Sequence, residues 1–157
     1  MAVVTELRIL SPLDLTFPRG LPGLGEAHEF HLEPLGDGSE PNPFGRLVAS
    51  GPVRLATGAT ASPLRLIVAA PALLWPEYAV TIDDATEALL EIERPDEAAA
   101  LVVVTLGTSV EASTANLFAP IVLNTTRRLA AQIVPDELTE ADLAAMYTPL
   151  PISTGGH

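Results

Sequence analysis

The sequence predicts a mainly β fold: a compact, single-domain antiparallel β-barrel or strongly curved sheet that carries two short helices. The first reason is the number of short segments with strand character. The second is the density of turn residues, with 15 prolines and 11 glycines among 157 residues. The third is that signals for a helix start occur at two places. Because aromatic residues make up only 4% of the chain, we expect aliphatic side chains to build the core.

Strands in the first half of the chain are predicted by polar and apolar alternation or by β-branched residues. These segments are 5–10, 30–35, 47–50 and 64–68. The stretch between the first two is punctuated by Pro12, Pro18, Gly20, Pro22 and Gly23. We therefore expect a tight, stiff loop there. Connectors rich in turn residues or small residues, at 36–43 and 56–62, separate the later strands.

A short helix is predicted to begin at Asp84. Glu87 stands three positions later, as the partner in a capping box. The apolar residues that follow have the i, i+3, i+4, i+7 spacing of one helix face: Ala85, Ala88, Leu89 and Ile92. Arg94 should end the helix because it precedes Pro95, and the residue before a proline disfavours helical geometry.

A second helix is predicted near the end of the chain. Thr139 is its N-cap, Asp142 stands at the third position, and the helix should end before Pro149. The glycines that follow predict a frayed end. The chain is thus divided into a barrel domain over residues 1–135 and a C-terminal helix with a flexible tail over 136–157.

The second half of the barrel is predicted to hold the centre of the core. Segment 99–106 is rich in β-branched residues and ends at Gly107, as expected for a strand buried on both faces. Strands at 117–123 and 129–134 flank the polar connector 124–128, whose length suits an antiparallel pair. Pro120 cannot donate to a sheet ladder, so 114–124 should be an edge strand or bulged at this proline.

The charge is strongly acidic. Twenty acidic residues face eight arginines and no lysine, which gives a net charge of −12. Direct nucleic-acid binding is not expected, since too few basic side chains are present to neutralise phosphates. Twelve of the acids lie in segments 77–97 and 136–142. Such a distribution fits either a docking face for a basic protein or an ordinary solvated surface.

No catalytic, cofactor or metal site is predicted. The chain has no cysteine, and a strand at 30–35 would turn His28 and His31 to opposite faces. Asp84 and Glu87 are explained by helix capping. A signal peptide and an 18-residue apolar run are not found, so we expect a cytoplasmic protein without a membrane span.

Two uncommon blocks in the same order resemble the signature of the flagellar assembly factor FliW family. The first is Phe-Pro-Arg-Gly-Leu-Pro-Gly at 17–23, and the second is Thr-Ala-Asn-Leu-Phe-Ala-Pro-Ile-Val-Leu-Asn at 114–124. The run Trp-Pro-Glu-Tyr at 75–78 is similar to a third family position, and the likeness covers about 3–134. It implies a β-barrel, non-enzymatic, cytoplasmic protein that binds flagellin and the RNA-binding translational regulator CsrA. In this family logic, flagellin displaces CsrA and so restores repression of flagellin synthesis.

These considerations give a set of candidate partner-binding residues. CsrA is expected to dock on acidic surface in 83–97 or 136–147, and flagellin along 114–124. Trp75 and Tyr78 are either interface anchors or part of the core. The candidates are Asn116, Leu117, Pro120, Ile121, Asn124, Trp75, Tyr78, Glu87, Glu91 and Asp142.

Two other classes of function stay open at this point. One is a small β-barrel enzyme or ligand carrier with its pocket in the barrel mouth. The other is a subunit that is stable only in an oligomer. We expect the function that the family resemblance implies, in a monomer that binds protein partners.

Overall fold

The computed structural model describes residues 2–4, 13–20, 28–34, 44–49, 53–54, 60–61, 65–75, 78, 80–109, 112–133 and 148–150. Its strands are β1 (Ala2–Val4), β2 (Leu13–Thr16), β3 (Glu29–Pro34), β4 (Phe44–Ala49), β5 (Val53–Arg54), β6 (Thr60–Ala61), β7 (Arg65–Ala69), β8 (Val80–Ile82), β9 (Ala98–Thr105), β10 (Thr114–Ala115), β11 (Ile121–Asn124), β12 (Leu129–Gln132) and β13 (Thr148–Pro149). Its helices are α1 (Pro71–Leu74), α2 (Asp84–Leu89) and the 3₁₀ turn η1 (Pro95–Glu97).

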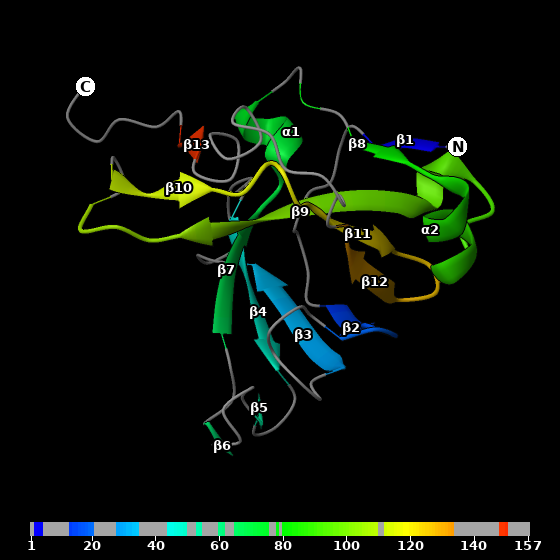
Figure 1. Cartoon of the computed structure of the whole chain (residues 1–157), viewed down its shortest axis with the longest axis horizontal. Coiled ribbons are helices and arrows are strands. Elements are labelled where there is room, and N and C mark those ends of the chain that lie inside the picture. Colours follow the sequence, from blue (N-terminus) through cyan, green and yellow to red (C-terminus); the bar gives the residue numbers. More distant parts are fainter. Residues whose placement is uncertain are drawn as a thin grey trace.

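Seven of these strands close into a barrel in the order β11, β12, β2, β3, β4, β7 and β9, with β9 pairing back to β11. Strand β9 makes this closure possible because it is eight residues long. Its first half pairs with β11 and its second half with β7. The pairings around the ring are antiparallel except that of β12 with β2. The mainly β, barrel-like fold class predicted from the sequence is confirmed (Figure 1).

Aliphatic side chains fill the barrel. The interior cluster comprises Leu15, Phe17, Phe30, Leu32, Leu47, Ala49, Val68, Ala99, Leu101, Ile121, Leu123 and Ala130. The rings of Phe17 and Phe30 meet edge to face, with centroids 5.1 Å apart. Among the described residues the interior of the barrel is therefore a packed core.

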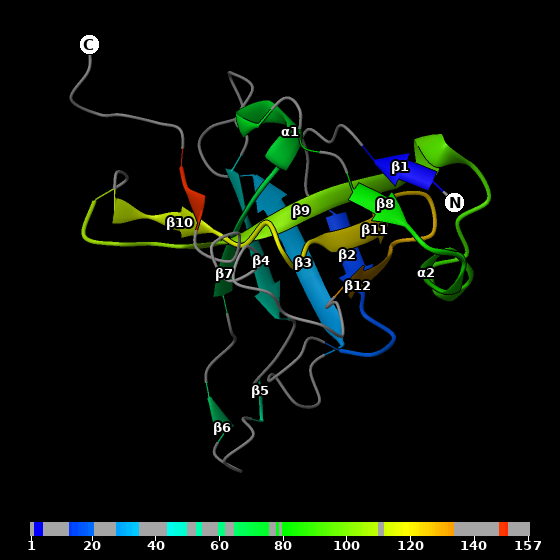
Figure 2. The same ribbon diagram turned by 45° about the horizontal axis from the view of Figure 1, so that its top comes forward.

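Strand β9 is buried on both faces, as predicted. Ala99 and Leu101 point into the barrel, whereas Ala98, Ala100, Val102 and Val104 point outward. The outward residues belong to two further clusters. One packs against β8 and the end of α2, and the other against α1, β10 and β13. Figures 1 and 2 show these elements toward opposite ends of β9, with the β1–β8 ribbon next to α2.

The predicted loop between the first two strands is only partly correct. Residues Leu13–Thr16 form β2, which pairs with β3 over four residues. The alternation of Leu13 and Leu15 with Asp14 and Thr16 is short and lies between prolines, so turn signals concealed it. The turn that follows is as tight as expected: the Gly20 amide donates to the Phe17 carbonyl at 2.8 Å, and Gly20 has a φ of 65°.

Helix α2 begins at Asp84 as predicted, but its cap and its end differ from the prediction. The N-cap is Asp83, whose carboxylate accepts a hydrogen bond from the Thr86 amide at 2.8 Å. The helix ends at Leu89 and not at Arg94. The apolar spacing continues to Ile92 because this residue reaches the core through a turn and not through the helix. The second predicted helix, after Thr139, and the predicted strand at 5–10 lie outside the described residues.

Candidate partner-binding site

The acidic residues of 83–97 gather around the helix α2 and the turn that follows it. We call this surface the acidic lobe and define it by Asp83, Asp84, Glu87, Glu91, Glu93 and Asp96. All of them are exposed except Glu87, which is half-buried. Hydrogen bonds from the Thr86 side chain and backbone lower the pKa of Asp83 below that of an ordinary aspartate.

The backbone at the end of α2 forms a Schellman motif. The Ile92 amide donates to the Glu87 carbonyl at 2.9 Å, and the Glu91 amide donates to the Ala88 carbonyl at 3.3 Å. This motif needs a left-handed residue at its C′ position, which is usually glycine. Glu91 takes that position with a φ of 55°. A non-glycine residue is strained there, so other contacts must hold the turn.

Asn124 supplies those contacts from the neighbouring strand β11. Its side chain is fully buried, and its Nδ2 donates to the carbonyls of Leu90 (2.9 Å) and Glu91 (3.1 Å). Its Oδ1 accepts from the amides of Thr126 and Arg127, both at 3.0 Å. One amide group thus satisfies carbonyls at the end of α2 and amides of the β11–β12 turn. The acidic lobe is fixed to the barrel at this point.

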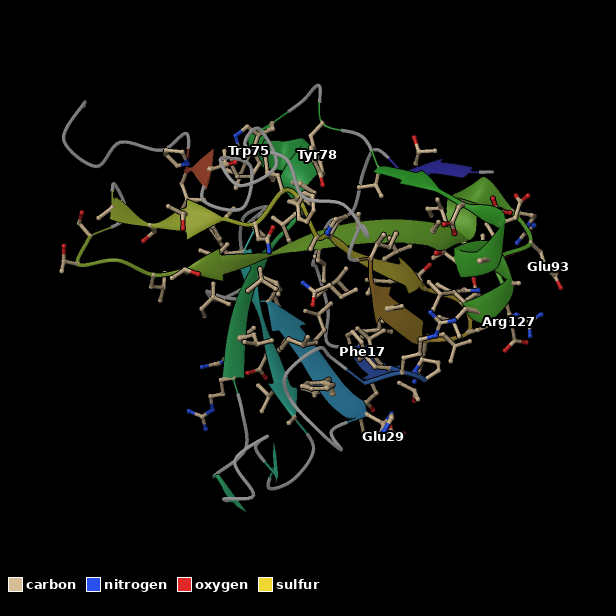
Figure 3. All side chains as sticks on the ribbon, in the orientation of Figure 1. Phe17, Glu29, Trp75, Tyr78, Glu93 and Arg127 are labelled. Carbon is tan, nitrogen blue, oxygen red and sulfur yellow. The ribbon has the colours of Figure 1, made fainter. Side chains whose placement is uncertain are left out.

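Arg127 crosses from that turn to the acidic lobe. Its guanidinium lies 3.4 Å from the carboxylate of Glu91 and 3.3 Å from that of Glu93. Arg94 makes a similar exposed contact with Asp96 at 3.7 Å. These ion pairs are open to water and contribute little to stability. Figure 3 shows Glu93 and Arg127 beside α2, at the surface of the molecule.

The segment 114–124 is interrupted, as its proline predicts. Strands β10 and β11 lie along the same edge of β9. The Asn116 amide still donates to the Val103 carbonyl of β9 at 2.9 Å, and residues 117–120 form the interruption before β11. The side-chain oxygen of Asn116 accepts from the amides of Phe118 and Ala119, both at 3.1 Å. Since β11 pairs on both sides, the bulge and not the edge-strand alternative is correct.

Trp75 and Tyr78 belong to the cluster outside β9. Both are half-buried, and both pack against the group that includes Val102 and Leu150. The Tyr78 hydroxyl donates to the Leu117 carbonyl at 2.7 Å, which ties the chain after α1 to the interrupted segment. Burial raises the pKa of Tyr78 to about 12. Figure 3 shows the two rings next to α1, above β9.

This raised pKa predicts a loss of stability in alkaline solution. The unfolded chain ionises Tyr78 near pH 10, while the folded state resists ionisation up to about pH 12. The stabilisation is therefore complete below pH 10 and is lost as the pH rises toward 12. The variant Tyr78→Phe should lack this part of the decline and be less stable at pH 7 by about 1 kcal/mol, the value of one hydrogen bond. Urea unfolding at pH 7 to 12 measures both effects; parallel curves for the two proteins would contradict the assignment.

The structure places the predicted site residues in three settings. Pro120, Ile121 and Asn124 are buried, so any effect on a partner would pass through the backbone they hold. Asn116, Leu117, Trp75, Tyr78 and Glu87 are half-buried, and Glu91 is exposed. Asp142 lies outside the described residues. Sequence reasoning did not find Arg127 as a partner of the lobe, because no periodic pattern links it to residues more than 30 positions away.

Comparisons with known proteins agree with this architecture. The family model described as FliW protein matches residues 3–145. The chain belongs to the FliW family. It is 34% identical to the flagellar assembly factor FliW of Bacillus licheniformis over 129 residues, which is 82% of each chain. The corresponding Bacillus subtilis protein is 32% identical, again over 82% of each chain.

The crystal structure of a flagellar assembly factor FliW superimposes with a TM-score of 0.60 at 28% identity. It covers 80% of this chain and 79% of its own. The resemblance of the two sequence blocks to the FliW family is thereby confirmed. Within the described ranges, no group of three or more His, Asp or Glu side chains could hold a metal ion. Nor does any helix there have the length and apolar character needed to cross a membrane.

Proposed function

We propose that this chain is a cytoplasmic flagellar assembly factor that binds flagellin and CsrA in turn. While the protein is bound to CsrA, CsrA does not repress flagellin synthesis. When flagellin accumulates, it displaces CsrA from the protein, and repression returns. Membership in the FliW family supports the flagellar role, since the similar curated proteins carry the name flagellar assembly factor. The switch is then governed by the concentrations and relative affinities of the two partners.

The acidic lobe is the observation that carries the CsrA part of the proposal. Its carboxylates stand on a helix end that Asn124 and the Schellman turn hold in place. An RNA-binding protein presents basic side chains to phosphates. A fixed array of exposed carboxylates is complementary to such a surface, and it would accelerate encounter more than it would raise final affinity.

The flagellin part of the proposal rests on the bulge at 117–120. Leu117 and Phe118 are half-buried there, between β10 and β11, and next to the Trp75 and Tyr78 cluster. Partly exposed apolar side chains on a backbone that is already ordered can receive the apolar face of a helix. The bulge lies along β9, whereas the acidic lobe lies at the far end of β11.

A pull-down with competition tests the proposal. The purified protein is offered CsrA and flagellin from the same cell, first separately and then together. We expect each to bind alone, and we expect an excess of flagellin to release bound CsrA. If neither binds a protein that melts cooperatively, the proposal is wrong and the likeness to FliW extends to fold alone. If both bind together without displacement, partner binding stands but the switch does not.

A further inference from the structure

The outer face of β3, β4 and β7 carries a cluster of basic side chains remote from the acidic lobe. His31 pairs across to Val48, and Val48 pairs across to Arg65. Glu33 and Arg46 form the neighbouring pair. Arg46 and Arg65 therefore stand diagonally on adjacent strands, at a spacing that lets long side chains reach the same point. We call His31, Arg46 and Arg65, with Val48 between them, the arginine face.

The arginine face has hydrogen-bond donors to spare. Arg46 uses its Nε to donate to the Glu33 carboxylate at 2.8 Å, and a guanidinium carries four further N–H donors. Arg65 is exposed and, in the part of the chain that the structure describes, pairs with no carboxylate. The Nδ1 of His31 lies 2.6 Å from Asp14, which leaves its Nε2 3.9 Å from Glu33.

These residues line a shallow hollow of about 210 Å³, together with Ala49. That is smaller than the roughly 300 Å³ at which pockets for small organic ligands begin. It has room for one or two side chains of another protein. Val48 and Ala49 give the hollow apolar lining, and Arg46, Arg65 and Glu33 give it charged lining.

We propose that the arginine face binds an acidic protein segment through a carboxylate side chain placed between Arg46 and Arg65. The fork of a guanidinium matches a carboxylate in two parallel hydrogen bonds. Arg46 already donates one such hydrogen bond, from its Nε, to the Glu33 carboxylate of the same chain. A second carboxylate, brought by the partner, would engage Arg65 and the remaining donors of Arg46.

The charge of the whole chain argues for a peptide and against a nucleic acid at this face. Arg46 already pairs with Glu33, so the positive charge of Arg65 is left to neutralise one further carboxylate, whereas a nucleic acid strand brings a phosphate with every nucleotide. With a net charge of −12, this protein would repel the unpaired phosphates. An acidic side chain flanked by neutral residues avoids most of that cost.

This inference goes beyond the proposed function, because it adds a surface of opposite character to those assigned to CsrA and flagellin. Strands β4 and β7 lie on the other side of the molecule from α2 in both views (Figures 1 and 2). A partner with an acidic segment could then be held while the acidic lobe is occupied. The tests below use neither flagellin nor CsrA, so failure here is distinguishable from failure of the proposed function.

The test titrates the full-length protein with a capped ten-residue Glu-Ser peptide that has one Glu at its centre and Ser elsewhere. Binding is followed through the NMR signals of the arginine Nε–H groups. At 0.15 M salt the Debye length is about 8 Å, so general repulsion is screened while direct contacts persist. We expect the Arg46 and Arg65 signals to shift. We expect Arg65→Gln to weaken binding about tenfold, as for loss of a charge-assisted hydrogen bond at a partly exposed site.

The matched control is Arg19→Gln, which removes the same charge from an exposed arginine in the turn after β2. It should leave the affinity for the peptide nearly unchanged. The proposal is overturned if Arg19→Gln and Arg65→Gln weaken binding equally, or if a Gln-Ser peptide binds as well as the Glu-Ser peptide. It is also overturned if inorganic phosphate or single-stranded polyuridylate displaces the peptide at lower concentration, because the site would then select phosphate.

Discussion

Replacing Asn124 with alanine is expected to lower the free energy of unfolding by about 3 kcal/mol, because a buried polar group and its partners lose their hydrogen bonds together. Asn124 is fully buried. Its Nδ2 serves the carbonyls of Leu90 and Glu91, and its Oδ1 serves the amides of Thr126 and Arg127. Water can replace few of these contacts, since the side chain lies between α2 and the barrel.

Thermal and urea unfolding measure this effect, with Asn116→Ala as the matched control. Asn116 also accepts two amide hydrogen bonds, but it is half-buried and donates to no helix end. Its loss should cost about 1 kcal/mol. For a chain of this size, the two variants should melt roughly 10 °C and 3 °C below the parent protein. Equal melting temperatures for Asn116→Ala and Asn124→Ala would contradict the role assigned to the long-range cap.

The variant Asn124→Asp separates the two halves of this contact. It keeps an acceptor for the turn amides of Thr126 and Arg127 but loses the donor to Leu90 and Glu91. The new negative charge faces the carbonyl end of α2, where the helix dipole is also negative. We therefore expect it to be nearly as unstable as Asn124→Ala, and more so at pH 8 than at pH 4. Stability close to that of the parent would mean that the turn, and not the helix end, needs Asn124.

Much of the barrel was predictable because its strands carry their own signals. The β-branched run of β9 and the polar connector between β11 and β12 identify the centre of the sheet and one hairpin. Strand β2 was not predicted, since four residues of alternation between prolines are too short to stand out. Its pairing with β3 and β12 decides its conformation, and these partners are distant in sequence.

The end of α2 shows a second limit of sequence reasoning. A Schellman turn is normally recognised by its glycine, and here the left-handed position is held by Glu91. The hydrogen bonds of Asn124, donated from 33 and 34 positions away, make that substitution tolerable. In the sequence the apolar spacing of a helix continues up to Ile92, and no local feature indicates that the helix ends earlier.

The candidate site was predictable in charge but not in geometry. The density of acids in 77–97 fitted either a docking face or an ordinary solvated surface. In the described residues six of those acids share the acidic lobe, whereas Glu97 is buried. The two asparagines of the 114–124 block were candidates for partner contact, whereas the structure gives each a backbone-capping role. Sequence alone could not separate these roles, because both call for a polar side chain in a strand.

The geometry also changes which acids should be mutated to test the CsrA proposal. The side chain of Glu87 is half-buried and its Oε1 is buried, so a lysine there would disturb local packing. Glu91 occupies the left-handed position of the Schellman turn, so it is also kept unchanged. Glu93 and Asp96 are exposed, and their ion pairs with Arg127 and Arg94 are open to water. They are the members of the lobe whose charge can be reversed with least structural cost.

The variant carrying Glu93→Lys and Asp96→Lys is expected to bind CsrA at least tenfold more weakly, chiefly through slower association, because complementary charge accelerates encounter. Its association rate should also lose most of its dependence on salt.

The control carries Glu29→Lys and Asp14→Lys, which change the net charge equally, from −12 to −8, but lie on β3 and β2. Figure 3 shows Glu29 far from Glu93. Stopped-flow association at several salt concentrations compares the two. If both variants slow association alike, the total charge of the protein matters and the acidic lobe is not the docking face; if only the lobe variant does, its position is what CsrA recognises.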